Sequence, residues 1–172
     1  MYHTVSSKLV YQSKWLKLYE DLVENRRGGI SKFNRITFHN FVEIVPILND
    51  GSILMIKIYR YGAKKDLLEL PAGYIEDNET PMKSAKRELL EETGYSCRSM
   101  KAKGWYYYIP SRSKQKVYVF VARGLKLISS LQLDEFENIS VVKLSKKQIQ
   151  RKMRSGQIKN SSVIAALMLA GF

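Results

Sequence analysis

Three glutamates stand close together near the middle of the chain, in the segment KRELLEETGY. Glu88, Glu91 and Glu92 occupy positions i, i+3 and i+4, which places all three carboxylates on one face of a helix. Like charges at this spacing destabilise an isolated helix by roughly 0.2–0.5 kcal/mol per pair, and the helix dipole disfavours them near its C-terminal end. A hard divalent cation such as Mg²⁺, which prefers oxygen ligands, would offset both penalties.

A second interpretation of the same residues needs no ligand. Arg87 lies four residues before Glu91 and can pair with its carboxylate. An ordinary solvated glutamate face, with Arg87 in a surface salt bridge, would give the same pattern. The spacing within the helix does not by itself decide between a metal site and such a face.

The segment that carries the glutamates has clear start and stop signals for a helix over residues 81–93. Thr80 is a favourable N-cap, and Pro81 takes the first helical position, where its missing N–H costs nothing. Gly94 is placed to end the helix in a left-handed conformation. An apolar stripe of Met82, Ala85 and Leu89 predicts which face is buried.

Most of the remaining chain is predicted to form strands, with further helices at the end. Alternating apolar residues and the turn RRGG predict a β-rich region in the first forty residues, and NDGS predicts a hairpin turn between two apolar runs. Two helices are predicted over residues 146–156 and 161–171, the second with Ser161 or Ser162 as its N-cap. A mixed sheet with helices packed on it follows from this order of elements.

Composition limits the class of protein. A chain of 172 residues with 45% hydrophobic residues suits one core, and no apolar run is long enough to span a membrane. The single cysteine, Cys97, excludes an internal disulfide, and with two histidines it cannot complete a zinc site of Cys and His ligands. A cytoplasmic location is the resulting expectation. The net charge of +13 is spread over short clusters, which indicates either a solvated basic surface or an attraction for anionic ligands.

The wider spacing of these residues resembles a known signature. Gly73 is followed after five residues by Glu79, and after seven more by Arg87-Glu88-Leu89, Glu91-Glu92 and Gly94-Tyr95. This pattern is similar to the signature of the Nudix hydrolases. The resemblance implies an α/β fold, an α/β/α sandwich with a mixed β-sheet, over residues 40–172. It leaves residues 1–39 as a small N-terminal β-region with a role in dimerisation or adenine contact.

The resemblance also implies roles for the residues of the signature. Glu88, Glu91 and Glu92 would be metal ligands together with the backbone carbonyl of Ala72, Glu91 being a ligand or an orienter of water. Arg87 would orient the glutamates. Mg²⁺ is the expected ion and Mn²⁺ the alternative. Gly73 would let its loop approach the helix closely, and Glu79 would brace the loop rather than touch the metal.

The flanking segments resemble the ADP-ribose pyrophosphatase branch of that family. In IKIYRYGAKKDLLELPAG, Arg60 would contact a phosphate or ribose of the substrate, and Glu69 would brace the loop or contact the nucleotide. Pro110 lies fifteen residues past the signature, where a proline marks this branch. The following loop departs from the branch, since Lys114-Gln115-Lys116 replaces an expected acidic position. That departure puts the group attached to the nucleoside diphosphate in doubt.

A second acidic segment, LDEFENISVV, resembles the loop that supplies the catalytic base in this branch. Glu135 is the candidate base, with Asp134 as its alternative, and Glu137 is a candidate further metal ligand. A charged loop before a strand, without catalytic function, remains the alternative.

The resulting prediction is hydrolysis of ADP-ribose, or of a close ADP-sugar, to AMP and ribose 5-phosphate by a homodimeric enzyme. Another nucleoside diphosphate derivative (an NDP-sugar, a dinucleoside polyphosphate or a capped RNA) is the alternative substrate. No membrane partner is expected, and a nucleic-acid partner is the lesser expectation. A third possibility is a ligand-sensing protein without turnover, although a pure binder has no need of Arg87 and all three glutamates.

Overall fold

The computed structural model describes residues 2–131 and 138–172. The chain divides into two compact units, one formed by residues 1–40 with 107–116 and the other by residues 41–106 with 117–172. The first unit therefore contains the predicted N-terminal region and also a segment from much later in the chain.

A three-stranded antiparallel sheet forms the first unit, in the order β1 (His3–Gln12), β2 (Leu16–Glu24) and β3 (Ile30–Phe38). The predicted RRGG turn between β2 and β3 is confirmed, with Gly28 at a φ of +77° that favours glycine. Asp21 is buried on this sheet, accepting hydrogen bonds from the Arg35 guanidinium at 2.7 Å and from the Ser7 hydroxyl. The bond from Arg35 and then that from Ser7 lower the pKa of Asp21, so the buried carboxylate stays charged.

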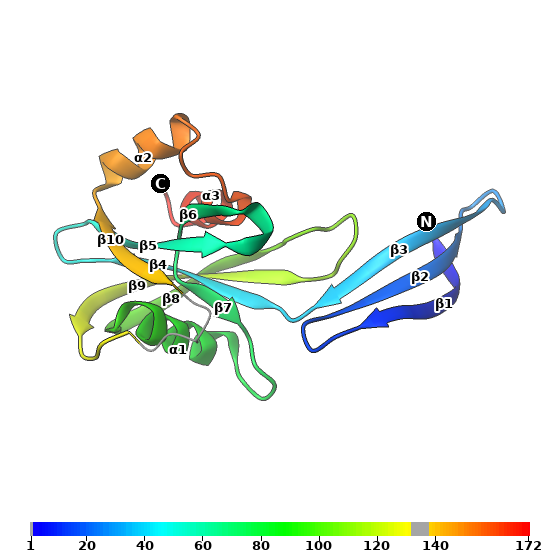
Figure 1. Ribbon diagram of the computed structural model, residues 1–172, viewed down its shortest axis with the longest axis horizontal. Coiled ribbons are helices and arrows are strands. Elements are labelled where there is room, and N and C mark those ends of the chain that lie inside the picture. The colour runs from blue at the N-terminus through cyan, green and yellow to red at the C-terminus, as the bar shows by residue number, and fades with distance from the viewer. Residues whose placement is uncertain (1, 132–137) are drawn as a thin grey trace. The chain divides into compact units, whose positions relative to one another are not determined.

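The second unit is built on a seven-stranded mixed sheet (Figure 1). Its main path runs β10-β5-β4-β9-β8, while β6 pairs with β5 and β7 with β4. Strands β4 and β9 are parallel, whereas β5 is antiparallel to both β10 and β4. The strands are β4 (Phe41–Ile47), β5 (Ile53–Arg60), β6 (Lys65–Glu69), β7 (Ala72–Tyr74), β8 (Tyr95–Tyr107), β9 (Lys116–Leu127) and β10 (Ile139–Leu144).

Helices cover both faces of this sheet, with α1 (Pro81–Thr93) on one side and α2 (Lys146–Arg154) and α3 (Ser161–Leu169) on the other (Figure 1). The alternation of strand residues explains the two cores. On β4, Val42 and Ile44 pack with Ala85 and Leu89 of α1. Val45 and Ile47 pack in the other core, which includes Ile149 of α2 and Val163, Ala166 and Leu167 of α3. The predicted mixed sheet between helical layers is thus confirmed.

The helix boundaries largely follow the predicted signals. Thr80, Pro81 and Gly94 begin and end α1 as expected, with Gly94 at a φ of +75°. At α3 the prediction of Ser161 or Ser162 as N-cap is wrong, because Asn160 caps the helix by accepting the Ser162 N–H. Asparagine is as good an N-cap as serine, so local preference alone does not separate the two.

No helix in the described residues is long and apolar enough to cross a membrane. A short 3₁₀ turn, η1 (Tyr61–Ala63), joins β5 to β6.

Candidate active site

Helix α1 presents its glutamates beside the loop that precedes it. The Thr80 hydroxyl accepts the Lys83 N–H at 3.3 Å, and the Gly94 N–H donates to the Leu90 carbonyl at 2.7 Å, so each helix end has a capping hydrogen bond. Ala85 and Leu89 are fully buried on the sheet side of the helix. Packing of this apolar stripe fixes the rotation of α1 and hence the direction of the carboxylates.

Arg87 lies at the centre of the acidic cluster. Its Nη1 donates to Glu88 Oε1 at 2.7 Å and to Glu91 Oε2 at 3.0 Å, and its Nη2 donates to Glu79 Oε2 at 3.0 Å. Nη2 also donates to the backbone carbonyl of Tyr74 at 3.0 Å. Desolvation opposes the charge on Arg87, but the three carboxylates outweigh it and raise the arginine pKa. The guanidinium therefore holds three glutamates and the preceding loop in one arrangement.

Glu79 braces that loop, as expected. Besides the bonds from Arg87, its carboxylate accepts a hydrogen bond from the Ser84 hydroxyl at 2.6 Å. The bonds from Arg87 and then from Ser84 lower the pKa of Glu79 to about 2. With its side chain 7% exposed, Glu79 joins the residues before α1 to the second turn of the helix.

Glu88 and Glu92 approach the backbone of β7. Glu92 is buried, and its Oε2 accepts the N–H of Ala72 at 2.8 Å. A Cβ atom on Gly73 would lie 1.9 Å from Glu88 Oε1, so no larger residue fits at this position without moving the carboxylate. The close approach expected of Gly73 is therefore present. It brings two predicted ligands next to Ala72, whose carbonyl is the predicted backbone ligand.

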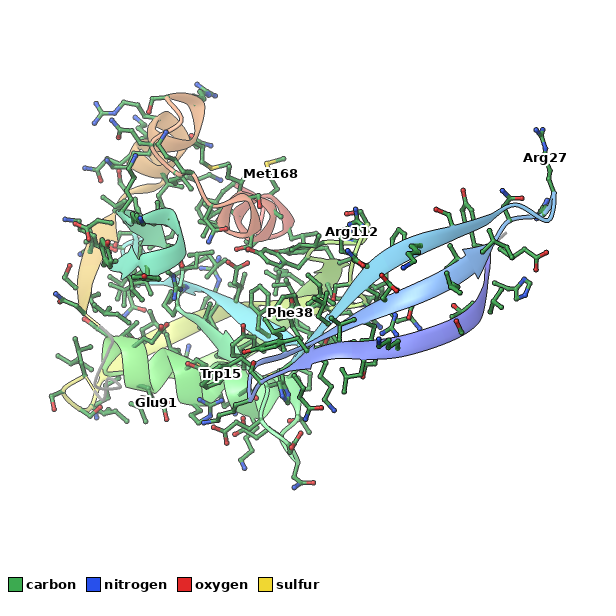
Figure 2. The ribbon with its side chains drawn as sticks, turned by 45° about the vertical axis from the view of Figure 1, so that its right-hand side comes forward. Trp15, Arg27, Phe38, Glu91, Arg112 and Met168 are labelled. Atoms are coloured by element: carbon green, nitrogen blue, oxygen red, sulfur yellow. The ribbon has the colours of Figure 1, made fainter. Side chains whose placement is uncertain are left out.

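The oxygens of Glu88, Glu91 and Glu92 suit a hard divalent cation, although in this structure they accept hydrogen bonds from Arg87 and from the Ala72 amide. Carboxylate and carbonyl oxygens are the ligands that Mg²⁺ and similar ions prefer. Within residues 2–131 and 138–172, no three acidic, His or Cys side chains are grouped so as to hold a metal ion. The reason is visible in the contacts: Glu88 and Glu91 turn to Arg87, and Glu92 turns to the Ala72 amide. The side chain of Glu91, near the end of α1 (Figure 2), is 34% exposed.

A second polar cluster, which we call the buried relay, starts from Arg60 at the end of β5. Arg60 Nη2 lies 2.7 Å from Glu69 Oε2, and its Nε lies 3.2 Å from the same oxygen. The other oxygen of Glu69 accepts the side-chain amide of Asn160 at 2.9 Å. Glu69 itself is 4% exposed, so both of its oxygens are used inside the protein. The structure thus gives Glu69 a bracing contact to Arg60.

The relay continues from Asn160 to a buried acid on β4. Asn160 Oδ1 accepts the N–H of Ser162 at 3.0 Å, and the Ser162 hydroxyl lies 2.8 Å from Glu43 Oε1. Glu43 Oε2 lies 3.0 Å from the Tyr106 hydroxyl. Burial raises the pKa of Glu43 to about 7, against the hydrogen bonds from Ser162 and Tyr106.

Sequence reasoning gave no site role to four members of the buried relay, namely Glu43, Tyr106, Asn160 and Ser162. Glu43 carried one usable signal, because it is the only charged residue in the apolar strand FVEIVPI. A carboxylate is rarely buried without partners, so its position already indicated a polar network.

The remaining predicted residues lie elsewhere in the chain. Pro110 belongs to the first unit, in the segment 107–116, and its role stays a prediction. Asp134, Glu135 and Glu137 fall outside the described residues, so the catalytic base and the further metal ligand also stay predictions.

Comparisons with known proteins extend over nearly the whole chain. A model of the NUDIX domain matches residues 37–162. The chain is 30% identical over 165 residues to the methanol dehydrogenase activator of Bacillus methanolicus, a match that covers 95% of this chain and 89% of the relative. It is 27% identical over 165 residues to the ADP-ribose pyrophosphatase of Bacillus subtilis, with the same coverage. A solved structure of an ADP compounds hydrolase has the same fold, with a TM-score of 0.89 at 23% identity over 98% of this chain and 91% of the other.

Proposed function

This chain is a member of the NUDIX family, and we propose that it is a Mg²⁺-dependent hydrolase of ADP-ribose or a close ADP-sugar, releasing AMP and a sugar phosphate. The main support is the arrangement around Arg87, which gathers Glu79, Glu88 and Glu91 beside the Gly73 backbone. Relatives named as ADP-ribose pyrophosphatases, including that of Bacillus subtilis, support the choice of substrate.

The proposed metal-binding residues are Glu88, Glu91, Glu92 and the carbonyl of Ala72, with Glu137 as a further ligand. A bound divalent cation would neutralise the pyrophosphate charge and make water a better nucleophile. Members of the NUDIX family generally use such an ion. Arg87 orients Glu88 and Glu91 through its two Nη1 contacts.

The proposed base is Glu135, with Asp134 as its alternative. Such a base would take a proton from the water that attacks a phosphorus of the pyrophosphate. The bond from that phosphorus to the bridging oxygen then breaks, and the two products are AMP and the sugar phosphate. On the substrate side, Arg60 would bind a phosphate or ribose oxygen while Glu69 holds its guanidinium.

Replacement of Glu92 tests the assignment directly. Glu92→Gln should lower kcat by several orders of magnitude, because a neutral amide is a poor ligand for a hard cation. The fold should persist, since the new amide oxygen can still accept the Ala72 N–H. Glu76→Gln is the matched control, since Glu76 is an exposed acid at one of the unspecified positions between Gly73 and Glu79. Near-normal turnover in Glu92→Gln would contradict the proposal.

A change of substrate within the same chemistry is the second candidate. Gln115, in the Lys114-Gln115-Lys116 segment that replaces an expected acidic position, is 5% exposed and donates from Nε2 to the His39 carbonyl at 2.6 Å. The Gln115 amide therefore forms a hydrogen bond within the first unit. With no acid at this residue, the terminal group of the substrate can differ from ribose. A panel of ADP-ribose, other nucleoside diphosphate sugars, dinucleoside polyphosphates and capped RNA, with product identification, separates the two. Release of AMP from ADP-ribose at a rate no higher than from the other compounds would favour the second candidate.

The assembly and location are proposals as well. Every residue of β1 is exposed in the single chain, including Val5, Leu9 and Tyr11, which is consistent with a second copy covering this strand. We therefore propose a homodimer formed through the first unit, in the cytoplasm. Light scattering on the purified protein tests the dimer, and a mass of 19.9 kDa at micromolar concentration would contradict it.

A further inference from the structure

The surface of α2 is strongly basic, and the stability of the helix does not explain its charge. The sequence KKQIQRKMR contains five cations and no acid. Cations in the last turn suit the helix dipole, but Lys146 and Lys147 in the first turn oppose it. Lys146 has a partner within the chain, since its Nζ donates to the Gly171 carbonyl at 3.1 Å. Lys147 has no such hydrogen bond or ion pair among the described residues, so its position is left without a structural reason.

Three of these cations form one line along the helix, which we call the basic stripe: Lys147, Arg151 and Arg154. Their spacing of i, i+4 and i+7 places them on one face, where like charges repel one another. All three are exposed, and none forms an ion pair with any residue in the described part of the chain. Together with Gln150 and Ser155 they line an open hollow of about 440 Å³.

The opposite face of α2 is fixed in the core. Ile149 is fully buried, and Met153 packs against the same core cluster. The helix that carries the basic stripe is therefore held in place before any ligand arrives. A basic amphipathic helix often binds membranes, but that mode requires an apolar face free to enter the lipid. The apolar residues of α2 are already used inside the protein.

We propose that the basic stripe binds the phosphodiester backbone of single-stranded nucleic acid. The stripe extends about 10 Å along the helix, which is longer than one phosphate group and suits several phosphates in series. A flexible single strand can adapt its phosphates to cations fixed on a rigid helix. The lining residues of the hollow include no aromatic side chain on which a base could stack, so binding rests on phosphate contacts, which carry no sequence information. The surface lies on the opposite face of the sheet from α1, which carries Glu88, Glu91 and Glu92 (Figure 1).

Binding of a fluorescein-labelled 20-nucleotide strand, measured by anisotropy, tests this inference. The test variant replaces the three stripe residues by glutamine. The control variant makes the same change in net charge at three exposed cations of β8 and β9, namely Lys101, Lys103 and Arg123. We expect the stripe variant to bind at least about tenfold more weakly at 0.1 M salt, and its salt slope to fall by about 2, because each phosphate contact contributes roughly 0.7.

The control variant should stay within about threefold of the unchanged protein, and both variants should keep their Tm. If the stripe variant does not fold, the single change Arg151→Gln takes its place, with a slope change of about 0.7. Equal loss in both triple variants would overturn the proposal in favour of general charge attraction. It would also fail if the unchanged protein bound no strand at 0.05 M salt, or bound anionic phosphatidylserine vesicles instead of the strand.

Discussion

The closest contact in the proposed active site predicts the effect of a single added methyl group. In Gly73→Ala the new Cβ would lie 1.9 Å from Glu88 Oε1, whereas ordinary contacts begin near 3.4 Å, so the carboxylate must retreat by about 1.5 Å. The backbone conformation at this position tolerates alanine, because Gly73 is not among the residues with positive φ. The change therefore acts through the position of Glu88 alone.

A displacement of this size should lower kcat strongly and the free energy of unfolding only slightly. A misplacement of about 1 Å can reduce a rate by about 10²-fold, so we expect kcat for ADP-ribose hydrolysis to fall by at least that factor. Loss of the 2.7 Å bond between Glu88 and Arg87 should lower the free energy of unfolding by only about 1–2 kcal/mol. Divalent-cation affinity, measured by calorimetry, should weaken together with kcat.

Gly62→Ala is the matched control for this substitution. A Cβ on Gly62 meets nothing within 4 Å, and its φ is not positive. The control should leave kcat and cation affinity unchanged. If Gly73→Ala retains kcat within about twofold of the unchanged enzyme, Glu88 is not held where the reaction needs it, and the reasoning fails.

The remaining predictions concern the buried relay and the brace. Asn160→Ser keeps the cap of α3 but loses the bond to Glu69, so KM for ADP-ribose should rise several-fold with kcat unchanged. In an Arg60→Ala background the same change should raise KM no further; an additive rise would separate the relay from Arg60. Glu43 has its pKa raised to about 7, so the folded protein binds the extra proton and its stability should decline as pH rises from about 4.5 to 7. Urea titrations should show that Glu43→Gln abolishes this decline, of order 1–3 kcal/mol, and an unchanged profile would contradict it. Glu79 has a pKa lowered to about 2, so its contribution is present above about pH 4.5 and is lost as pH falls toward 2; Glu79→Gln should flatten that acid limb.

The part of the site that sequence could predict is the part made by local geometry. Helical spacing places Glu88 and Glu91 on one face and sets Arg87 one turn before Glu91, and the cap signals at Thr80 and Gly94 predict where the helix begins and ends. These relations involve residues within one helix. Folding adds the contacts from outside the helix, namely the approach of Gly73, the Ala72 N–H on Glu92 and the Tyr74 carbonyl on Arg87. Of these, the known signature also implies the approach of Gly73.

The buried relay could not be predicted in the same way, because its contacts join distant parts of the chain. Asn160 and Glu69 are 91 residues apart, and Ser162 and Glu43 are 119 apart. No spacing rule connects such pairs; they meet only because α3 packs on β4. The choice of Asn160 as the cap of α3 depends on this packing too, since its amide then reaches Glu69 while its oxygen caps the helix.

The contacts of Arg87 explain how a dense group of glutamates can fold without a cation. Glu88 and Glu91 would repel one another at their helical spacing, but both accept from Arg87 Nη1. If these two carboxylates turn toward a cation, Arg87 still keeps Glu79 and the Tyr74 carbonyl through Nη2. Glu79 thus does more than brace the loop, because it leaves the guanidinium paired in either arrangement. The energetic cost of releasing two glutamates to a metal is lowered by a third glutamate that stays in place.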